Sequence, residues 1–179
     1  MNNEKVENKK MEAVGVVVVF AIMLLANIIL SKVFNKVISS GVDIPLIVYG
    51  TIIEIAIVIP AIVYTKMKGE KLGESFGFHK IKVSTVLLTV LLTVLSAPLY
   101  MCANVLSQIF VPNTMIQASS ELTSGPLWAS FFVMAIAAPV CEEIALRGFC
   151  NNRLRRITSL VIAALVSAVM FEIIHLSRR

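Results

Sequence analysis

The chain alternates long apolar runs with short polar links. Five runs are long enough to cross a membrane, because roughly 20 apolar residues span a bilayer; they lie at 13–34, 44–65, 83–111, 126–149 and 158–176. A lone strand cannot satisfy its backbone hydrogen bonds in lipid, so each run is expected to be a helix. The pattern therefore predicts an all-α fold, a polytopic transmembrane bundle of five spanning helices.

The composition narrows the class of protein further. Of the 179 residues, 58% are hydrophobic and only 15% are charged, which excludes an ordinary soluble domain. Residues 1–12 are polar and are expected to form an N-terminal tail, and residues 13–179 a single transmembrane domain. The run after the tail has no small-residue cleavage site, so the first span is expected to stay in the mature chain.

The basic residues gather at one side of the predicted spans. Of the 16 Lys and Arg residues, three lie in the tail, five in the link after the second span and four around the turn after the fourth, whereas link 112–125 has none. By the positive-inside rule the basic side is cytoplasmic, which predicts an integral membrane protein with an internal N-terminus. A bacterial cell membrane is the expected location. The charges form no stripe with aromatic residues, so nucleic acid is not an expected partner.

Two carboxylates and an arginine interrupt the fourth span, in the sequence AAPVCEEIALRG at 137–148. An ionisable group near the middle of a membrane helix costs about 2.5–3.5 kcal/mol on insertion scales, so such a cluster is a candidate site. Glu143 and Arg147 are four residues apart and are expected to form an ion pair. Glu142 is predicted to diverge from Arg147, which leaves it as the reactive carboxylate. The competing interpretation is a salt-bridge cluster that only holds helices together.

The last span contains a histidine that is expected to lie at a similar depth. Phe171 and His175, in FEIIH, are four residues apart and share a helix face. If the fourth helix continues to a turn near Arg156, Glu142 lies about 14 residues before the turn and His175 about 18 after it, or roughly 21 and 27 Å. Two antiparallel helices would then bring the carboxylate and the imidazole into one pocket. Alternatively, the histidine is only a packed, hydrogen-bonded residue.

A pocket of this kind supports two chemical routes. A glutamate and a histidine can activate water by general base catalysis, with Arg147 stabilising the negative charge that develops. They can also hold a divalent metal such as zinc, whose bound water becomes the nucleophile. The residues do not match HExxH, so metal ligands would have to come from separate helices. The sequence leaves both routes open.

Three further residues bear on this region. Pro139 removes a backbone donor, so the helix is predicted to kink beside the glutamates. Glu54 is a carboxylate in the second span that could tune the pocket, carry protons or hydrogen-bond a neighbouring helix while protonated, and we favour the last. Glu172 is predicted to point elsewhere on its helix.

The sequences APVCEEIALRGF and FEIIHLS resemble the first two motifs, EExxxR and FxxxH, of the CAAX protease and bacteriocin-processing enzyme family, the Abi or Rce1-type intramembrane endopeptidases. The resemblance covers roughly residues 126–177 and implies a multi-pass membrane metalloendopeptidase. Carried over by motif, Glu142 would be the catalytic base, supported by Glu143 and Arg147. His175 would orient water or the transition state, or act as a ligand, and Phe171 would shape the substrate pocket.

The resemblance also implies the partners and the cofactor. Eukaryotic relatives trim prenylated CAAX tails and many bacterial ones are linked to peptide processing or bacteriocin immunity, so membrane lipid and a peptide or lipidated protein substrate are expected. The implied cofactor is a divalent metal such as zinc, although a glutamate-dependent mechanism without tightly bound zinc has also been argued. The alternative is a non-catalytic membrane immunity or peptide-binding protein. A transporter has less support, because the charges cluster in one helix hairpin.

The sequence departs from the family pattern at its end. Members carry a third motif, a His with an Asn or Asp four residues on, in a later helix. Here the sequence stops at Arg179, and the only histidine besides His175 is His79, in an upstream loop. We expect a truncated form of a longer protein, with weak or no peptidase activity as it stands.

Overall fold

The computed structural model describes residues 2–110 and 126–177, and within these ranges it contains helices and no strand. The chain divides into two compact units, one of residues 1–78 and 125–179 and the other of residues 79–124. Four described helical stretches are long and apolar enough to cross a membrane: Val6–Ser39, Leu46–Met67, Val83–Ser107 and Leu127–Ile157. This confirms the prediction of an all-α polytopic bundle.

The helix bounds differ from the predicted spans at several ends. Helix α1 (Asn2–Ser39) begins inside the predicted polar tail, whose Glu, Lys and Met residues are good helix formers. The fifth predicted span corresponds to α9 (Leu160–Leu176), which at 17 residues is shorter than the other four. In the second unit, α4 (Val83–Ser107) is the third predicted span. Residue 111 of that span and the base-free link 112–125 lie outside the described residues.

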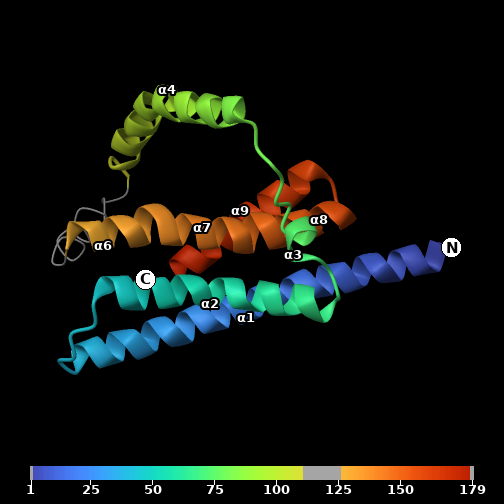
Figure 1. Ribbon diagram of the computed structural model, residues 1–179, viewed down its shortest axis with the longest axis horizontal. Coiled ribbons are helices and arrows are strands. Elements are labelled where there is room, and N and C mark those ends of the chain that lie inside the picture. Colours follow the sequence, from blue (N-terminus) through green and yellow to red (C-terminus); the bar gives the residue numbers. More distant parts are fainter. Residues whose placement is uncertain (1, 111–125, 178–179) are drawn as a thin grey trace. The chain divides into compact units, whose positions relative to one another are not determined.

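The first unit is built around the pair of α1 and α2 (Leu46–Met67), which lie side by side (Figure 1). The short helix α3 (Leu72–Ser75) follows α2. The fourth apolar stretch contains two π-helical segments, written η, and is continuous through α6 (Leu127–Phe131), η1 (Phe132–Ala137), α7 (Ala138–Glu142), η2 (Glu143–Asn151) and α8 (Asn152–Ile157). This stretch packs on α2 through η1, α7 and η2, and on α1 through α8.

A short turn reverses the chain between α8 and α9. Thr158 is extended and ends α8, and the Ser159 hydroxyl accepts a hydrogen bond from the backbone N–H of Ile162, which caps the start of α9. Helix α9 then packs on η2. The turn thus pairs the helix that carries the glutamates with the helix that carries the histidine.

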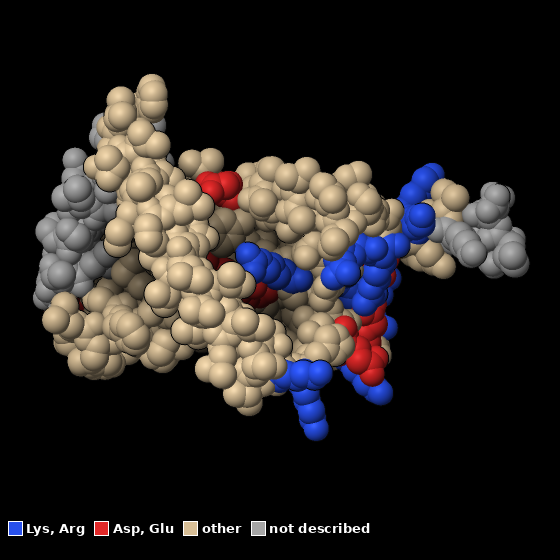
Figure 2. All heavy atoms as spheres, turned by 90° about the horizontal axis from the view of Figure 1, so that it is seen from above, with Lys and Arg blue, Asp and Glu red and all other residues tan. Residues whose placement is uncertain are grey.

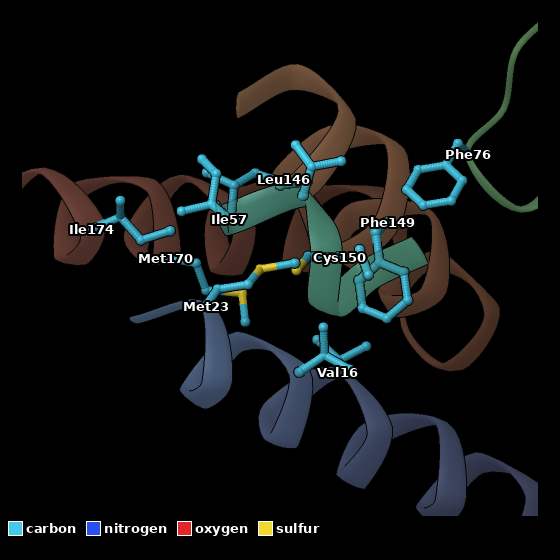
Figure 3. Packing of buried hydrophobic residues seen from close by; sticks show 13 residues of the cluster. Val16, Met23, Ile57, Phe76, Leu146, Phe149, Cys150, Met170 and Ile174 are labelled. Carbon is cyan, nitrogen blue, oxygen red and sulfur yellow. The ribbon is translucent and has the colours of Figure 1, made fainter. Parts of the chain in front are cut away.

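The core of the first unit lies where α1, α2, η2 and α9 meet (Figure 3). The buried positions recur every three or four residues, as one helix face requires. In membrane helices such faces are held by close van der Waals packing. The buried apolar side chains of this cluster are Val16, Val19, Met23, Ile57, Val58, Ala61, Phe76, Ala145, Leu146, Phe149, Cys150, Met170 and Ile174.

A buried arginine joins α8 to α1 and to the loop after α2. Arg153 is fully buried; its Nη1 lies 2.8 Å from Glu12 Oε2 and its Nη2 2.9 Å from Glu70 Oε2. The guanidinium also lies 4.9 Å from the ring centroids of both Tyr64 and Phe149. A planar, delocalised cation suits two carboxylates and two aromatic faces at once. From the sequence alone, Arg153 is expected only to be one of the basic residues that set the topology.

Glu70 is the acceptor that this network shares. Arg156 lies 3.3 Å from Glu70 and 3.6 Å from Glu12, and the Ser75 hydroxyl donates a hydrogen bond to Glu70. Partial burial alone would raise the pKa of Glu70. The hydrogen bonds from Ser75 and Arg156 and the charges of Arg153 and Arg156 outweigh it, so the pKa of Glu70 is lowered from its ordinary value.

Candidate active site

Glu142 and His175 lie next to each other in the first unit. Glu142 is the last residue of α7 and His175 is in the last turn of α9, with His175 Nε2 3.5 Å from Glu142 Oε1. The Glu142 side chain is 11% exposed and the His175 side chain 40%. The helix that carries Glu142 continues to Ile157, as the depth argument required. The structure thus brings together the carboxylate and the imidazole that the sequence pattern placed at similar depth.

Phe171 fixes the orientation of the imidazole. Its ring stacks on that of His175 with centroids 4.2 Å apart, and its backbone carbonyl lies 3.0 Å from His175 Nδ1. A carbonyl can only accept, so Nδ1 carries the proton in this hydrogen bond. In the neutral ring, Nε2 therefore presents its lone pair towards Glu142. A water molecule at this contact can donate a hydrogen bond to both groups.

The second glutamate pairs with the arginine, as predicted. Arg147 Nη1 lies 3.1 Å from Glu143 Oε1, and both side chains are exposed. An exposed pair of this kind is worth at most about 1 kcal/mol to the fold. Both residues also line a pocket beside Glu142.

A pocket of about 470 Å³ lies between η2 and α9. This volume falls within the range of ligand sites. Ala164 and Ala168 leave space on the α9 side. The polar and aromatic residues that line the pocket are Glu142, Glu143, Arg147, Asn151, Ser167, Phe171 and Glu172.

Two predictions about side-chain direction are wrong. Glu142 and Arg147 do not diverge, because both line the same pocket. The reason is that η2 is π-helical, with hydrogen bonds from residue i to i+5, so residues five apart come to one side. Glu172 does not point away either, since it also lines the pocket. It continues the spacing of four from Ala164 and Ala168, a signal that the sequence did offer.

Two further sequence-based predictions concern Pro139 and Glu54. Pro139 lies in the first turn of α7, directly after the π-helical segment η1, and the kink predicted there stays a prediction. Glu54 is buried on α2 and lines a different pocket, of about 220 Å³, together with Ser31, Asn35 and Tyr49. It does not line the pocket beside Glu142.

A second pocket, of about 310 Å³, adjoins the first. Both are lined by Glu143, Arg147 and Asn151, and the second also by Asn152 and the loop Phe76–Phe78. The loop approaches the helix closely because Gly77 has a φ of +69° and a Cβ there would lie 2.7 Å from Asn152 Nδ2. The sequence does not predict this second pocket, because no periodicity links the loop to η2.

The described residues do not make a metal centre by themselves. Within 2–110 and 126–177, no group of three or more His, Cys, Asp and Glu side chains comes together to hold an ion. Zinc sites in proteins usually have at least three protein ligands, and Glu142 and His175 provide two.

Comparison with known proteins supports the motif assignment. Residues 124–178 match the family model described as "Type II CAAX prenyl endopeptidase Rce1-like". This match confirms the family resemblance over the part of the chain that contains both motifs, and it links this part to CAAX-type proteases of membranes. No curated protein and no solved structure matches the chain significantly.

Proposed function

We propose that the chain is an intramembrane endopeptidase in which Glu142 activates a water molecule and His175 orients it. The observation that carries the proposal is the 3.5 Å contact between Glu142 and His175, with Glu142 on the wall of a 470 Å³ pocket. The family match at residues 124–178 supports a peptide bond as the bond that is cut. A membrane-associated peptide, CAAX-type or bacteriocin-like, is the proposed substrate.

The proposed reaction uses only groups of this chain and one water. Glu142 accepts a proton from the water as the water oxygen attacks the peptide carbonyl carbon. The carbonyl carbon becomes tetrahedral and its oxygen becomes an oxyanion, which the Arg147 guanidinium on the pocket wall stabilises. Glu142 then gives the proton to the amide nitrogen as the carbon–nitrogen bond breaks. The products are a new carboxylic acid and a new amine, and Glu142 returns to its starting state.

The adjoining pockets suit an extended peptide. Asn151 lines both of them, and its Oδ1 is buried without a hydrogen-bond partner among the described residues. A buried acceptor without a partner is costly, and the N–H of a peptide backbone would satisfy it. We therefore propose that Asn151 positions the substrate backbone where it crosses from one pocket to the other.

Cleavage of a prenylated peptide in proteoliposomes, followed by mass spectrometry over hours, tests the catalytic role. Because general base catalysis contributes about 10²- to 10⁴-fold, Glu142→Gln is expected to lower kcat at least 100-fold. Glu74→Gln, on the exposed face of α3, is the matched control and should keep wild-type activity. Cleavage at the wild-type rate by Glu142→Gln would contradict the proposal.

Asn151→Ala tests substrate positioning separately. Loss of one backbone hydrogen bond is worth about 1 kcal/mol, so KM should rise roughly fivefold while kcat stays close to that of the wild type. Asn104→Ala, in the second unit, is the control. An unchanged KM would remove Asn151 from the substrate path and leave the role of Glu142 standing.

The second candidate function is a non-catalytic membrane protein that binds a peptide in the same pockets. The observation that favours it is the buried Asn151 Oδ1, which has no hydrogen-bond partner among the described residues, lines both pockets and can bind a peptide backbone without any chemical step. Peptide binding by the wild-type chain without any product, and with equal affinity in Glu142→Gln, would support this function over hydrolysis.

A further inference from the structure

A groove between α1 and α2 lies where both helices pass from polar to apolar sequence. It has a volume of about 360 Å³ and shares no residue with the pockets beside Glu142. Lys10 on α1 and Lys68 at the end of α2 line its polar part, together with Glu7. Met11, Val14 and Val18 line its apolar part, and all three are exposed.

The floor of the groove depends on a close helix approach. A Cβ on Gly15 would lie 2.0 Å from the Tyr64 hydroxyl, so only glycine lets this ring lie against α1. The Lys68 ammonium lies 5.8 Å from the centroid of the same ring. Tyr64 also contacts the buried Arg153 guanidinium, which lies 4.9 Å from its ring centroid. The lysine is therefore placed above a ring that is itself fixed.

The net charge of the groove determines which ligands it can bind. Two lysines and one glutamate give a formal net charge of +1 on the lining residues. Most Lys and Arg side chains visible in Figure 2 lie in the right half of the view, the half in which Figure 1 places the start of α1. Basic pockets between membrane helices at the membrane surface attract anionic lipid headgroups.

We propose that this groove binds an anionic phospholipid. The phosphodiester lies between Lys10 and Lys68, and one acyl chain lies against Val14 and Val18, which continue into the first apolar span. A free phosphate would use only the lysines and leave the apolar wall exposed. A zwitterionic lipid brings its own cation, which the net positive lining disfavours. The site is independent of the peptidase proposal.

Native mass spectrometry of the full chain in detergent, titrated with phosphatidylglycerol or phosphatidylcholine, tests this site. Each lysine near an anionic membrane surface contributes about fivefold, so Lys10→Gln with Lys68→Gln should weaken phosphatidylglycerol binding roughly 25-fold. The matched control pair, Lys32→Gln with Lys36→Gln, lies near the other end of α1 and should change it less than twofold.

A second variant separates a groove from a merely basic surface. Val14→Trp keeps both lysines but fills the apolar part, and should also weaken phosphatidylglycerol binding. The proposal is overturned if Val14→Trp binds like the wild type, if the two lipids bind equally well, or if glycerol 3-phosphate competes as strongly as the intact lipid.

Discussion

Replacement of Arg153 by alanine should destabilise the first unit more than any other single loss of charge in it. The side chain is fully buried and makes ion pairs of 2.8 Å to Glu12 and 2.9 Å to Glu70. Removal of one partner from a buried pair costs about 3–5 kcal/mol, because a charge is left without compensation. Here the two carboxylates stay partly exposed and keep Arg156 at 3.6 and 3.3 Å, which reduces the penalty. We therefore expect a loss of about 3 kcal/mol.

Unfolding in mixed micelles by sodium dodecyl sulfate, followed by circular dichroism, measures this loss. Arg155→Ala is the matched control, because Arg155 is the exposed neighbour on the same helix and should change stability by less than about 0.5 kcal/mol. A double-mutant cycle with Glu12→Ala should give a coupling energy above about 1 kcal/mol. Equal stabilities of Arg153→Ala and Arg155→Ala would refute the idea that the buried guanidinium anchors α8.

Three other outcomes follow from the structure. Because the pKa of Glu70 is lowered in the folded state, its contribution to stability is complete above the ordinary pKa and is lost as the pH falls through the folded-state pKa. In pH-dependent thermal unfolding, acid should therefore destabilise the wild type more than Glu70→Gln. Gly15→Val should clash with Tyr64 and cost about 3 kcal/mol, as overpacking does, whereas Gly73→Ala, with open space around it, should be neutral in the same unfolding assay. Glu143→Gln should slow peptide cleavage less than the loss of the catalytic base, and should change stability by less than about 1 kcal/mol, since its ion pair is exposed.

The contact between Glu142 and His175 could be predicted from the number of residues that separate each of them from the turn. Roughly equal lengths of helix on both sides of one turn place Glu142 and His175 together, and this holds because the fourth stretch stays helical to Ile157. The ion pair of Glu143 and Arg147 likewise follows from spacing alone.

The local geometry was harder to predict. A π-helical segment changes which residues share a side of the helix, and no residue pattern around Glu142 and Arg147 predicts such a segment. Arg153 looked like its neighbours Arg155 and Arg156 in a basic turn. One signal was available: Arg153 follows the buried residues Leu146, Phe149 and Cys150 at the spacing of three or four that one helix face requires. This spacing would have indicated that Arg153 faces the core.

A double-mutant cycle on peptide cleavage tests most directly whether Glu142 and His175 act as one unit. The rates of Glu142→Gln, His175→Ala and the double variant are compared with the wild type in the same proteoliposomes. Because residues that act together have non-additive effects, the double variant should be no slower than Glu142→Gln alone. Independent effects that multiply in the double variant would contradict the account.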